Sequence, residues 1–296
     1  MPALVATLVA DLSRARLSDA RLDALAQAAP GYDGRAWLDE GTAADLFFEG
    51  DLATTRAALS AALAQDPVDV IVQPKQDREK RLLVADMDST LIGQECLDEL
   101  AAFAGVGAKV AAITERAMRG EIAFEPALRE RVSLLAGLRA DVIGTVLDQR
   151  IRLNPGARTT TRTMRARGAR VAIVSGGFRQ FTSAILERIG GDEDRANTLE
   201  IEDQQLTGRV AEPVLGQDAK LAALREIATG MGLSLSQTMA VGDGANDLAM
   251  IQAAGLGVAF RAKPKVAAAA HARIDHAGLT ALLFAQGIAR CEFVED

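Results

Sequence analysis

The pattern of hydrophobic and polar positions changes near residues 75–80 and divides the chain into two parts. The first part, residues 1–74, predicts strand (Leu4–Val9), helix (Ser18–Ala29), two strands around Gly41 and Thr42, helix (Leu52–Ala64) and strand (Val68–Val72). Apolar residues in the helical segments recur at the spacing of one buried face. The order β-α-β-β-α-β is that of a ferredoxin-like module. The polar stretch that follows contains Pro74 and predicts a linker at 75–80.

From residue 81 onward, short apolar runs end abruptly in polar clusters. Arg81–Ala85 is followed by DMDST, Val171–Val174 by SGGF and Met239–Val241 by GDGAND. Helical patterns follow the second and third clusters, at Phe178–Ile189 and Ala245–Ala254. Strands alternating with helices predict an α/β domain over 81–296, with a parallel sheet covered on both faces. Since ligands bind at the carboxyl ends of such strands, the three clusters predict an active site.

Residues 95–153 interrupt this alternation with helix-period apolar residues and no convincing strand. We expect a helical insertion between the first strand and its return helix. Insertions of this length commonly act as lids or substrate-selecting caps.

Composition and charge narrow the class of protein. One hydrophobic core usually stops growing at about 250–300 residues, and the chain has 296, so we expect two domains. A formal charge of −7 without a basic block argues against nucleic acid or anionic lipid as a partner. No apolar run approaches the roughly 20 residues of a membrane span. The apolar segment Ala3–Ala10 lacks a preceding basic residue, so we interpret it as a buried strand and not a signal core.

Cys96 and Cys291 match no metal or redox spacing, which favours a reducing compartment, and we expect a cytoplasmic protein.

Four aspartates at two strand ends indicate a metal site. Asp86 and Asp88 are two residues apart in extended backbone and point to the same side, and Asp243 and Asp247 follow another strand. Close carboxylates repel unless a cation or a proton lies between them, and oxygen ligands suit Mg²⁺. The alternative for DMDST alone is an acidic turn that caps a helix.

The segment Ser175-Gly176-Gly177 follows a strand and, in this interpretation, opens a helix whose N–H groups can bind an oxyanion. Taken alone it could be an ordinary N-cap and turn. Lys220 lies in the helical pattern Gln217–Ile227 and offers a compact positive charge; a solvated helix surface is its other interpretation.

An acidic metal site, a hydroxyl, backbone donors and a lysine together indicate phosphoryl transfer. The chain has no GxxxxGK[ST] loop, which disfavours a P-loop nucleoside triphosphatase. His271 and His276 lie late in the chain, apart from every cluster, and are expected at the surface. We therefore expect an aspartate to take the covalent step.

The ordered motifs at Asp86–Thr90, Ser175–Phe178, Lys220 and Gly242–Asp247 resemble the haloacid dehalogenase superfamily of phosphatases. The DMDST motif followed by Glu95, the stretch Met118–Leu135 and GDGANDLAM resemble the phosphoserine phosphatases within it. This resemblance covers about residues 80–290, and the N-terminal module is similar in pattern to amino-acid-sensing ACT domains.

The resemblance implies a role for each motif. Asp86 would be the nucleophile and Asp88 the general acid and then base. Mg²⁺ would be held by Asp86, the Asp88 backbone carbonyl and Asp243, and Asp247 would orient metal-bound water. The phosphoryl oxygens would be bound by residues of the other motifs, namely Ser175, Gly176, Gly177 and Lys220, with Asn246 nearby.

Substrate choice would rest on the cap. Arg131 falls in the apolar stripe of Phe124, Leu128, Leu135 and Leu138, where an unpaired guanidinium is costly to bury. The resemblance implies that Arg131 binds the substrate carboxylate and that Glu95 binds the substrate ammonium. It also implies that Met118 and Phe124 close the pocket. Alternatively Arg131 reaches solvent beside Glu130, and Glu95 is a first-turn residue favoured by the helix dipole.

The leading hypothesis is a Mg²⁺-dependent hydrolase that releases serine and phosphate from O-phosphoserine, a small-molecule substrate, as the last step of serine synthesis. One alternative keeps the chemistry with another small phosphomonoester. A second is a regulatory amino-acid-binding protein whose phosphatase domain is inert. The N-terminal module is expected to bind serine or to form a homodimer contact.

Overall fold

The computed structural model describes residues 3–119, 121–216 and 218–295, without the side chain of Met118. The N-terminal part has the predicted element order β-α-β-β-α-β, and its antiparallel sheet has the strand order β2-β3-β1-β4. Its elements are β1 (Ala3–Ala10), α1 (Asp19–Ala26), β2 (Tyr32–Asp39), β3 (Ala43–Glu49), α2 (Leu52–Ala62) and β4 (Val68–Pro74). Both helices are shorter than predicted; Ser18 is the N-cap of α1, since its side chain accepts from the N–H of Arg21.

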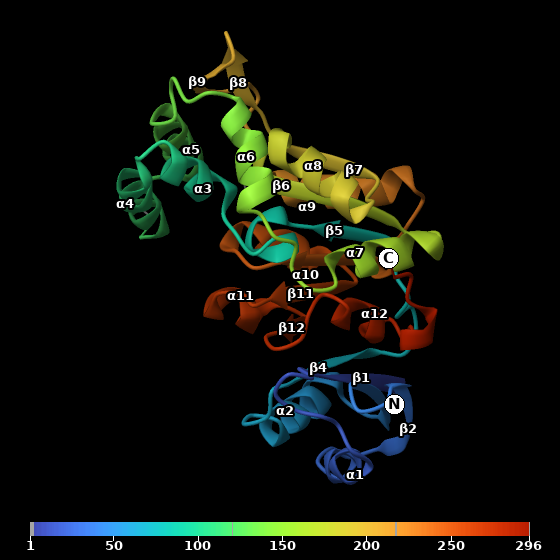
Figure 1. The fold of residues 1–296 in the computed structure, drawn as a ribbon. Helices are drawn as coiled ribbons and strands as arrows, with labels where there is room; N and C mark the ends of the chain where they lie inside the picture. Colours follow the sequence, from blue (N-terminus) through green and yellow to red (C-terminus); the bar gives the residue numbers. More distant parts are fainter. Residues whose placement is uncertain (1–2, 120, 217, 296) are drawn as a thin grey trace.

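Side chains alternate between the two faces of the N-terminal sheet, and along β1, β3 and β4 those on both faces are mostly buried. Leu4 and Leu8 of β1 pack with residues of α1 and α2. Val9 and Ile71 belong instead to the core of the C-terminal part. Figure 1 shows the consequence, with α1 and α2 on the outer face and the other face turned toward α12 and β12. The apolar Ala3–Ala10 segment is thus a buried strand, as expected.

The connection between the two parts is packed and bonded. The side chain of Gln73 donates to the carbonyl of Ala285 at 2.6 Å, and the backbone N–H of Lys80 donates to Oε1 of Gln286 at 2.9 Å. Asp69 accepts backbone hydrogen bonds from residues 275–277. The polar residues that predict a linker therefore form contacts between the parts.

The C-terminal part is built on a parallel sheet, which confirms the α/β prediction. In sheet order its strands are β12 (Ala272–Ile274), β11 (Leu256–Phe260), β10 (Thr238–Gly242), β5 (Leu82–Ala85), β6 (Arg170–Phe178) and β7 (Glu193–Asn197). One face packs against α9 (Asp218–Gly230) and α10 (Leu248–Ala253). The other face packs against α7 (Ala157–Ala166), α8 (Arg179–Ile189) and α12 (Ala281–Ala285).

The helical insertion forms a separate lobe beside the sheet (Figure 1). It contains α3 (Cys96–Phe103), α4 (Gly107–Met118), α5 (Phe124–Ser133) and α6 (Asp141–Gln149), which we call the cap. A hairpin of β8 (Leu199–Glu202) and β9 (Gln205–Val210) fixes its far end, since the N–H of Leu206 donates to Leu138 and its carbonyl accepts from Gly137. The sequence patterns did not predict this hairpin, nor β7, β11 and β12. The remaining short elements are η1 (Met87–Leu91), η2 (Leu235–Gln237), η3 (Ala245–Asp247), α11 (Pro264–Ala269) and η4 (Arg290–Glu292).

The structure also tests the predictions for the histidines, the cysteines and membrane-spanning segments. His271 is half-buried, and its Nδ1 accepts from the N–H of Gly257 at 3.1 Å, so the prediction of a surface residue is wrong there. His276 is half-buried as well. Both cysteines are free, Cys96 buried and Cys291 exposed. Within the described residues, no helix combines the length and apolar character that a membrane span requires.

Candidate active site

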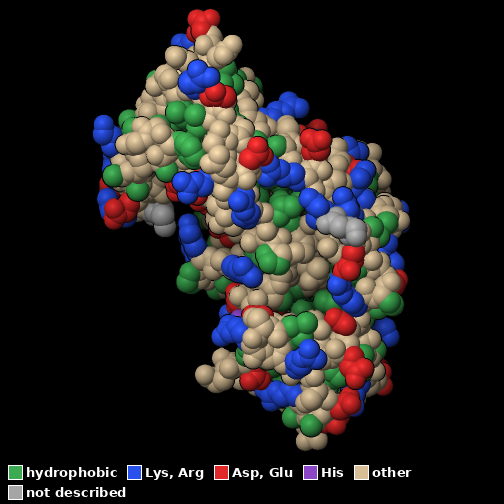
Figure 2. Space-filling model, viewed as in Figure 1, with side chains coloured by type: hydrophobic (Ala, Val, Ile, Leu, Met, Phe, Trp, Pro, Cys, Tyr) green, Lys and Arg blue, Asp and Glu red, His purple; other side chains and the backbone are tan. Residues whose placement is uncertain are grey.

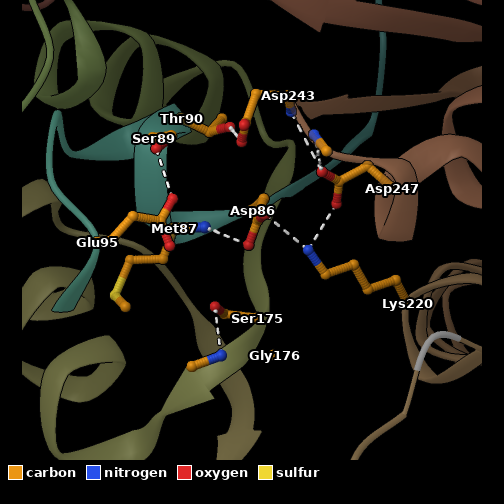
Figure 3. Close-up of polar contacts among 12 residues, drawn as sticks. Asp86, Met87, Ser89, Thr90, Glu95, Ser175, Gly176, Lys220, Asp243 and Asp247 are labelled. Carbon is orange, nitrogen blue, oxygen red and sulfur yellow. Dashed lines mark hydrogen bonds and ion pairs between the residues drawn. The ribbon is translucent and has the colours of Figure 1, made fainter. Parts of the chain in front are cut away.

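Asp86 lies directly after β5, and its N–H extends the sheet by donating to the carbonyl of Val241 at 3.0 Å. Both oxygens of its carboxylate are held. Oδ1 accepts from the N–H of Met87 at 2.7 Å, and Oδ2 lies 2.7 Å from Nζ of Lys220 (Figure 3). Because charge-assisted contacts fix both oxygens of a buried group, Asp86 presents its carboxylate in one orientation.

The DMDST motif forms one wide turn, η1, and not a continued strand. Ser89 has a φ of +56°, in the left-handed region that L-residues adopt rarely. Its hydroxyl donates to Oε1 of Glu95 at 2.7 Å, and the hydroxyl of Thr90 donates to Oδ1 of Asp243 at 3.2 Å. The turn thereby orients two further carboxylates, one from the start of the cap and one from the end of β10.

Lys220 is buried, so its interpretation as a solvated helix residue is wrong. Its ammonium lies between Asp86 and Asp247, at 2.5 Å from Oδ1 of the latter. Burial opposes the charge, but these two carboxylates raise the pKa of Lys220 above its usual value. We conclude that Lys220 is a fixed positive charge inside the site.

Asp247 is held so tightly that it restricts its neighbours. Its Oδ2 accepts from the N–H groups of Gly244 at 2.9 Å and Asp243 at 3.2 Å. A Cβ on Gly242 would lie 2.3 Å from Cγ of Asp247, a distance that real Cβ atoms essentially never show. Only glycine therefore fits at position 242 with Asp247 in place.

Three carboxylates are close enough to share a cation. Oxygens of Asp86, Asp243 and Asp247 lie within 4.8 Å of one another (Figure 3). Three carboxylates and one ammonium leave two negative charges, which a divalent cation would balance. The donors are hard oxygen atoms, which fit Mg²⁺. Among the described residues, the side chain of Asp88 is not part of this group.

Two carboxylates of this cluster have raised pKa values, because they are buried close to another negative charge. Burial raises the pKa of Asp243 to about 6, and the charge of Asp86 adds to the effect. Burial and Asp86 raise the pKa of Asp247 to about 7, against the influence of Lys220. A cation bound among these groups would favour their ionised forms.

The carboxyl group of Asp88 is held by the start of the cap. Its Oδ1 accepts from the backbone N–H of Cys96 at 3.2 Å. Burial, together with the charge of Glu95, raises the pKa of Asp88 to about 8. This shift favours the protonated form of Asp88, which can donate a proton.

The Ser175-Gly176-Gly177 segment lies in the irregular end of β6, where the pairing with β7 shifts register between Val174 and Phe178. The helix α8 begins only at Arg179, so the prediction that this segment opens a helix is wrong. Ser175 is buried, and its Oγ accepts from the N–H of Gly177 at 3.0 Å. The segment nevertheless brings the Ser175 hydroxyl to the site, and its two glycines allow a ligand to approach the backbone closely.

The cap reaches this segment. A Cβ on Gly176 would lie 3.1 Å from Cζ of Phe124, the first residue of α5, so the ring lies against the glycine. Arg131 on the same helix is half-buried; its Nε donates to the carbonyl of Ala127 at 3.2 Å and an Nη to Thr114 at 3.4 Å. Among the described residues it forms no ion pair closer than 4.0 Å. Figure 2 shows a hollow beneath the cap lobe, with Lys and Arg side chains beside it.

The charges of the cap residues interact. Burial lowers the pKa of Arg131, while Asp98 and Glu95 oppose that shift. Burial of its carboxyl raises the pKa of Glu95, although much of the residue is exposed. Of the apolar stripe around Arg131, Leu128 lies on α5, but Leu135 and Leu138 follow the end of the helix at Ser133.

Asn246 and Met118 are the remaining residues that the sequence predicts for the site. Asn246 lies in η3, half-buried, with its Oδ1 folded so closely over Gly244 that a Cβ there would be 2.3 Å away. The side chain of Met118 lies outside the described part of the structure.

The sequence patterns missed Ser89, Thr90 and Cys96. The two hydroxyl residues follow the acidic pair directly, so a search for donors next to candidate ligands would have found them. Cys96 gave no signal, because its contact with Asp88 depends on how the chain turns between them.

Comparison with known proteins places this geometry in a family. Residues 83–252 match the haloacid dehalogenase-like hydrolase family. A phosphoserine phosphatase of Streptomyces coelicolor is 48% identical over 241 residues, which cover 81% of this chain and 58% of that protein. The chain thus spans less than two thirds of that relative's length.

Solved structures agree over most of the chain. A haloacid dehalogenase family hydrolase of Salmonella enterica serovar Typhi has a TM-score of 0.83 at 30% identity, covering 95% of this chain and 97% of its own. A phospho-aspartyl intermediate analogue of phosphoserine phosphatase has a TM-score of 0.65 at 42% identity, covering 70% of this chain and 98% of its own. With its matched region, its fold and its ordered acidic motifs, this chain belongs to the haloacid dehalogenase-like hydrolase family.

Proposed function

We propose that this protein hydrolyses O-phosphoserine to serine and phosphate through an aspartyl-phosphate on Asp86. The observation that carries the proposal is the pairing of two subsites. The cluster around Asp86 and Lys220 suits a phosphoryl group, and the cap brings Arg131 and Glu95 toward it as partners for a carboxylate and an ammonium. The name of the Streptomyces coelicolor relative supports the same substrate.

Mg²⁺ is the proposed cofactor, held by the carboxylates of Asp86 and Asp243 and the backbone carbonyl of Asp88, with Asp247 orienting metal-bound water. When bound, it would neutralise charge on the phosphoryl group and on the site. Thr90 would keep Asp243 oriented, through the hydroxyl contact at 3.2 Å.

The two aspartates of the first motif have separate tasks. Asp86 is held by Lys220 and the N–H of Met87 in one orientation, which favours attack on phosphorus in line with the leaving oxygen. Asp88, in its protonated form, gives its proton to the serine oxygen as that bond breaks. The resulting carboxylate then takes a proton from the water that hydrolyses the aspartyl-phosphate.

Four residues around Asp86 would bind the phosphoryl oxygens. Ser175 offers its hydroxyl, Gly176 and Gly177 offer backbone N–H groups, and Lys220 offers a fixed ammonium. Asn246, which precedes Asp247 in η3, would add an amide donor. Preorganised donors of this kind stabilise the charge of the transition state.

The cap would recognise the amino acid. Arg131 would bind the substrate carboxylate, which supplies the counter-ion its half-buried guanidinium lacks among the described residues. Glu95, fixed by Ser89, would bind the ammonium. Phe124, which already lies against Gly176, and Met118 would close the pocket and exclude water.

The division of the chain is also proposed: an ACT-like module over 1–74, a connection at 75–80 and a phosphatase domain over 81–296 with its cap at about 95–153. The module would bind serine or form a homodimer contact. Calorimetry with serine and sedimentation of the full-length protein test the two roles. Absence of both heat and dimer would contradict them.

The deciding experiment measures phosphate release from O-phosphoserine, with and without Mg²⁺, in wild type and Asp86→Asn. We expect Mg²⁺-dependent release that the substitution abolishes; activity retained in Asp86→Asn would overturn the nucleophile. Phosphothreonine and a sugar phosphate serve as competing substrates. Arg131→Ala should weaken phosphoserine more than a sugar phosphate, whereas equal losses would refute the amino-acid pocket and leave another phosphomonoester as the substrate.

A further inference from the structure

The carboxyl group of Asp88 is held by two elements that lie far apart in the sequence. On one side, Cys96 is the first residue of α3 and therefore the start of the cap. Its backbone N–H donates to Oδ1 of Asp88 at 3.2 Å. Cys96 is fully buried, so solvent does not compete for this donor.

On the other side, Gly177 at the end of β6 leaves the space that the carboxyl group occupies. A Cβ at this position would lie 2.8 Å from Oδ2 of Asp88 and 3.2 Å from Oγ of Ser175. The first of these distances is shorter than real Cβ contacts, so an alanine would have to displace Asp88. The φ of Gly177 is outside the left-handed region, and backbone conformation therefore does not explain the glycine.

We propose that Cys96 and Gly177 are positioning residues that aim the Asp88 carboxyl group at the leaving oxygen of the substrate. This inference rests on the proposed function, in which Asp88 protonates that oxygen. As the bond between phosphorus and the serine oxygen breaks, and the bond to Asp86 forms, the Asp88 proton moves to the serine oxygen. The product is a neutral hydroxyl, and Asp88 becomes a carboxylate.

The inference also connects the cap to the chemistry. Because one donor belongs to α3 and the open space belongs to the core strand β6, the Asp88 carboxyl group is aligned only when the cap and the core are in this arrangement. A substitution that fills the space at Gly177 or removes the N–H of Cys96 should misplace the acid without removing the nucleophile, the acidic cluster or Lys220.

The test uses substrates that differ in their need for an acid. The serine oxygen leaves as a poor alkoxide unless it is protonated, whereas p-nitrophenyl phosphate releases a phenolate that is stable without a proton. The quantity measured is kcat/KM, which covers the steps up to departure of the leaving group and excludes hydrolysis of the aspartyl-phosphate. Variants are Gly177→Ala and Cys96→Pro, which removes the backbone N–H at the first position of α3, where proline is tolerated. The controls are Cys96→Ala, which keeps the N–H, and Gly144→Ala, at a glycine with open space around it.

We expect Gly177→Ala to lower kcat/KM for phosphoserine about a hundredfold, the order of loss for an acid displaced by roughly 1 Å. Cys96→Pro should lower it about tenfold, as expected for the loss of one hydrogen bond to an ionisable group, and Cys96→Ala should match wild type because the N–H remains. For p-nitrophenyl phosphate, Cys96→Pro should lose less than about threefold, and the controls should match wild type. Gly177 also belongs to the proposed phosphoryl site, so for Gly177→Ala the expected result is a loss about tenfold smaller with the aryl substrate than with phosphoserine.

Asp88→Asn distinguishes the inference from the proposal on which it rests. If Asp88→Asn prefers the aryl substrate and Gly177→Ala and Cys96→Pro lose both substrates equally, or lose neither, the positioning role is refuted alone. If Asp88→Asn itself loses both substrates equally, the acid role of Asp88 is refuted, and the positioning role with it. Near-ultraviolet circular dichroism of each variant confirms its fold, and the two positions lie on different elements, so one misfolded variant leaves the other to decide.

Discussion

Arg78 should hold the N-terminal module on the catalytic domain. Its guanidinium donates to both carboxylate oxygens of Asp45, at 2.8 and 3.1 Å, and to the hydroxyl of Thr7 at 3.2 Å. On the other side it donates to the carbonyls of Phe284 and Ala285, both at 3.2 Å. Asp45 is 1% exposed, so its charge has almost no access to water.

The perturbation is Arg78→Ala. It leaves the buried carboxylate of Asp45 with the Thr7 hydroxyl and leaves two carbonyls without this donor. Removing one partner of a buried ion pair costs about 3–5 kcal/mol, since the remaining charge stays desolvated. We therefore expect the free energy of unfolding of the N-terminal module to fall by about that amount.

The assay follows urea unfolding by the fluorescence of Trp37, the only tryptophan of the chain, which lies on β2 of this module. Arg139→Ala is the control, because its ion pair with Asp141 is exposed and its loss should leave the transition unchanged. The double variant Asp45→Ala, Arg78→Ala should lose less than the sum of the single variants. A loss below about 1 kcal/mol in Arg78→Ala would show that the contact does not hold the module.

Three further predictions concern the site and the stability of the domain. Lys220→Met should lower kcat for phosphoserine by about 10²–10³, because it removes the ammonium between Asp86 and Asp247; an unchanged kcat would contradict its role. Gly242→Ala should weaken Mg²⁺ binding, measured by calorimetry, because the new Cβ displaces Asp247, and unchanged affinity would show that Asp247 does not support the ion. Burial, with the charges of Arg56 and Lys80, lowers the pKa of His271, and its Nδ1 must stay unprotonated to accept from Gly257. As pH falls below about 6.5, the His271 imidazole binds a proton in the unfolded chain but not in the folded chain. The free energy of unfolding should therefore fall by at most about 1.4 kcal/mol per pH unit. His271→Asn should reduce this slope in urea unfolding between pH 7.5 and 5.5, and identical slopes would refute the assignment.

The sequence by itself determined the elements whose cause is local. Apolar runs that end in Asp86, Ser175 and Asp243 predicted a parallel sheet with its chemistry at one edge, because strand ends and side-chain alternation follow from short-range pattern. The same logic gave the N-terminal element order. It also predicted that Asp86, Asp243 and Asp247 lie together, because their strands end at the same edge of the sheet, but it was wrong to include the side chain of Asp88 in that cluster.

Tertiary structure decided everything that depends on contacts across the chain. In the sequence, Lys220 cannot be distinguished from an ordinary helix residue. Packing buries it between two carboxylates. The contact of Asp88 with Cys96, and the space that Gly177 leaves for it, depend on a turn with a left-handed residue that no apolar pattern encodes. The sequence predicted Arg78 as a linker residue, yet it joins the N-terminal sheet to α12. Hydrophobic periodicity reports only whether a position is buried, and the partner of a buried polar group is chosen by the fold around it.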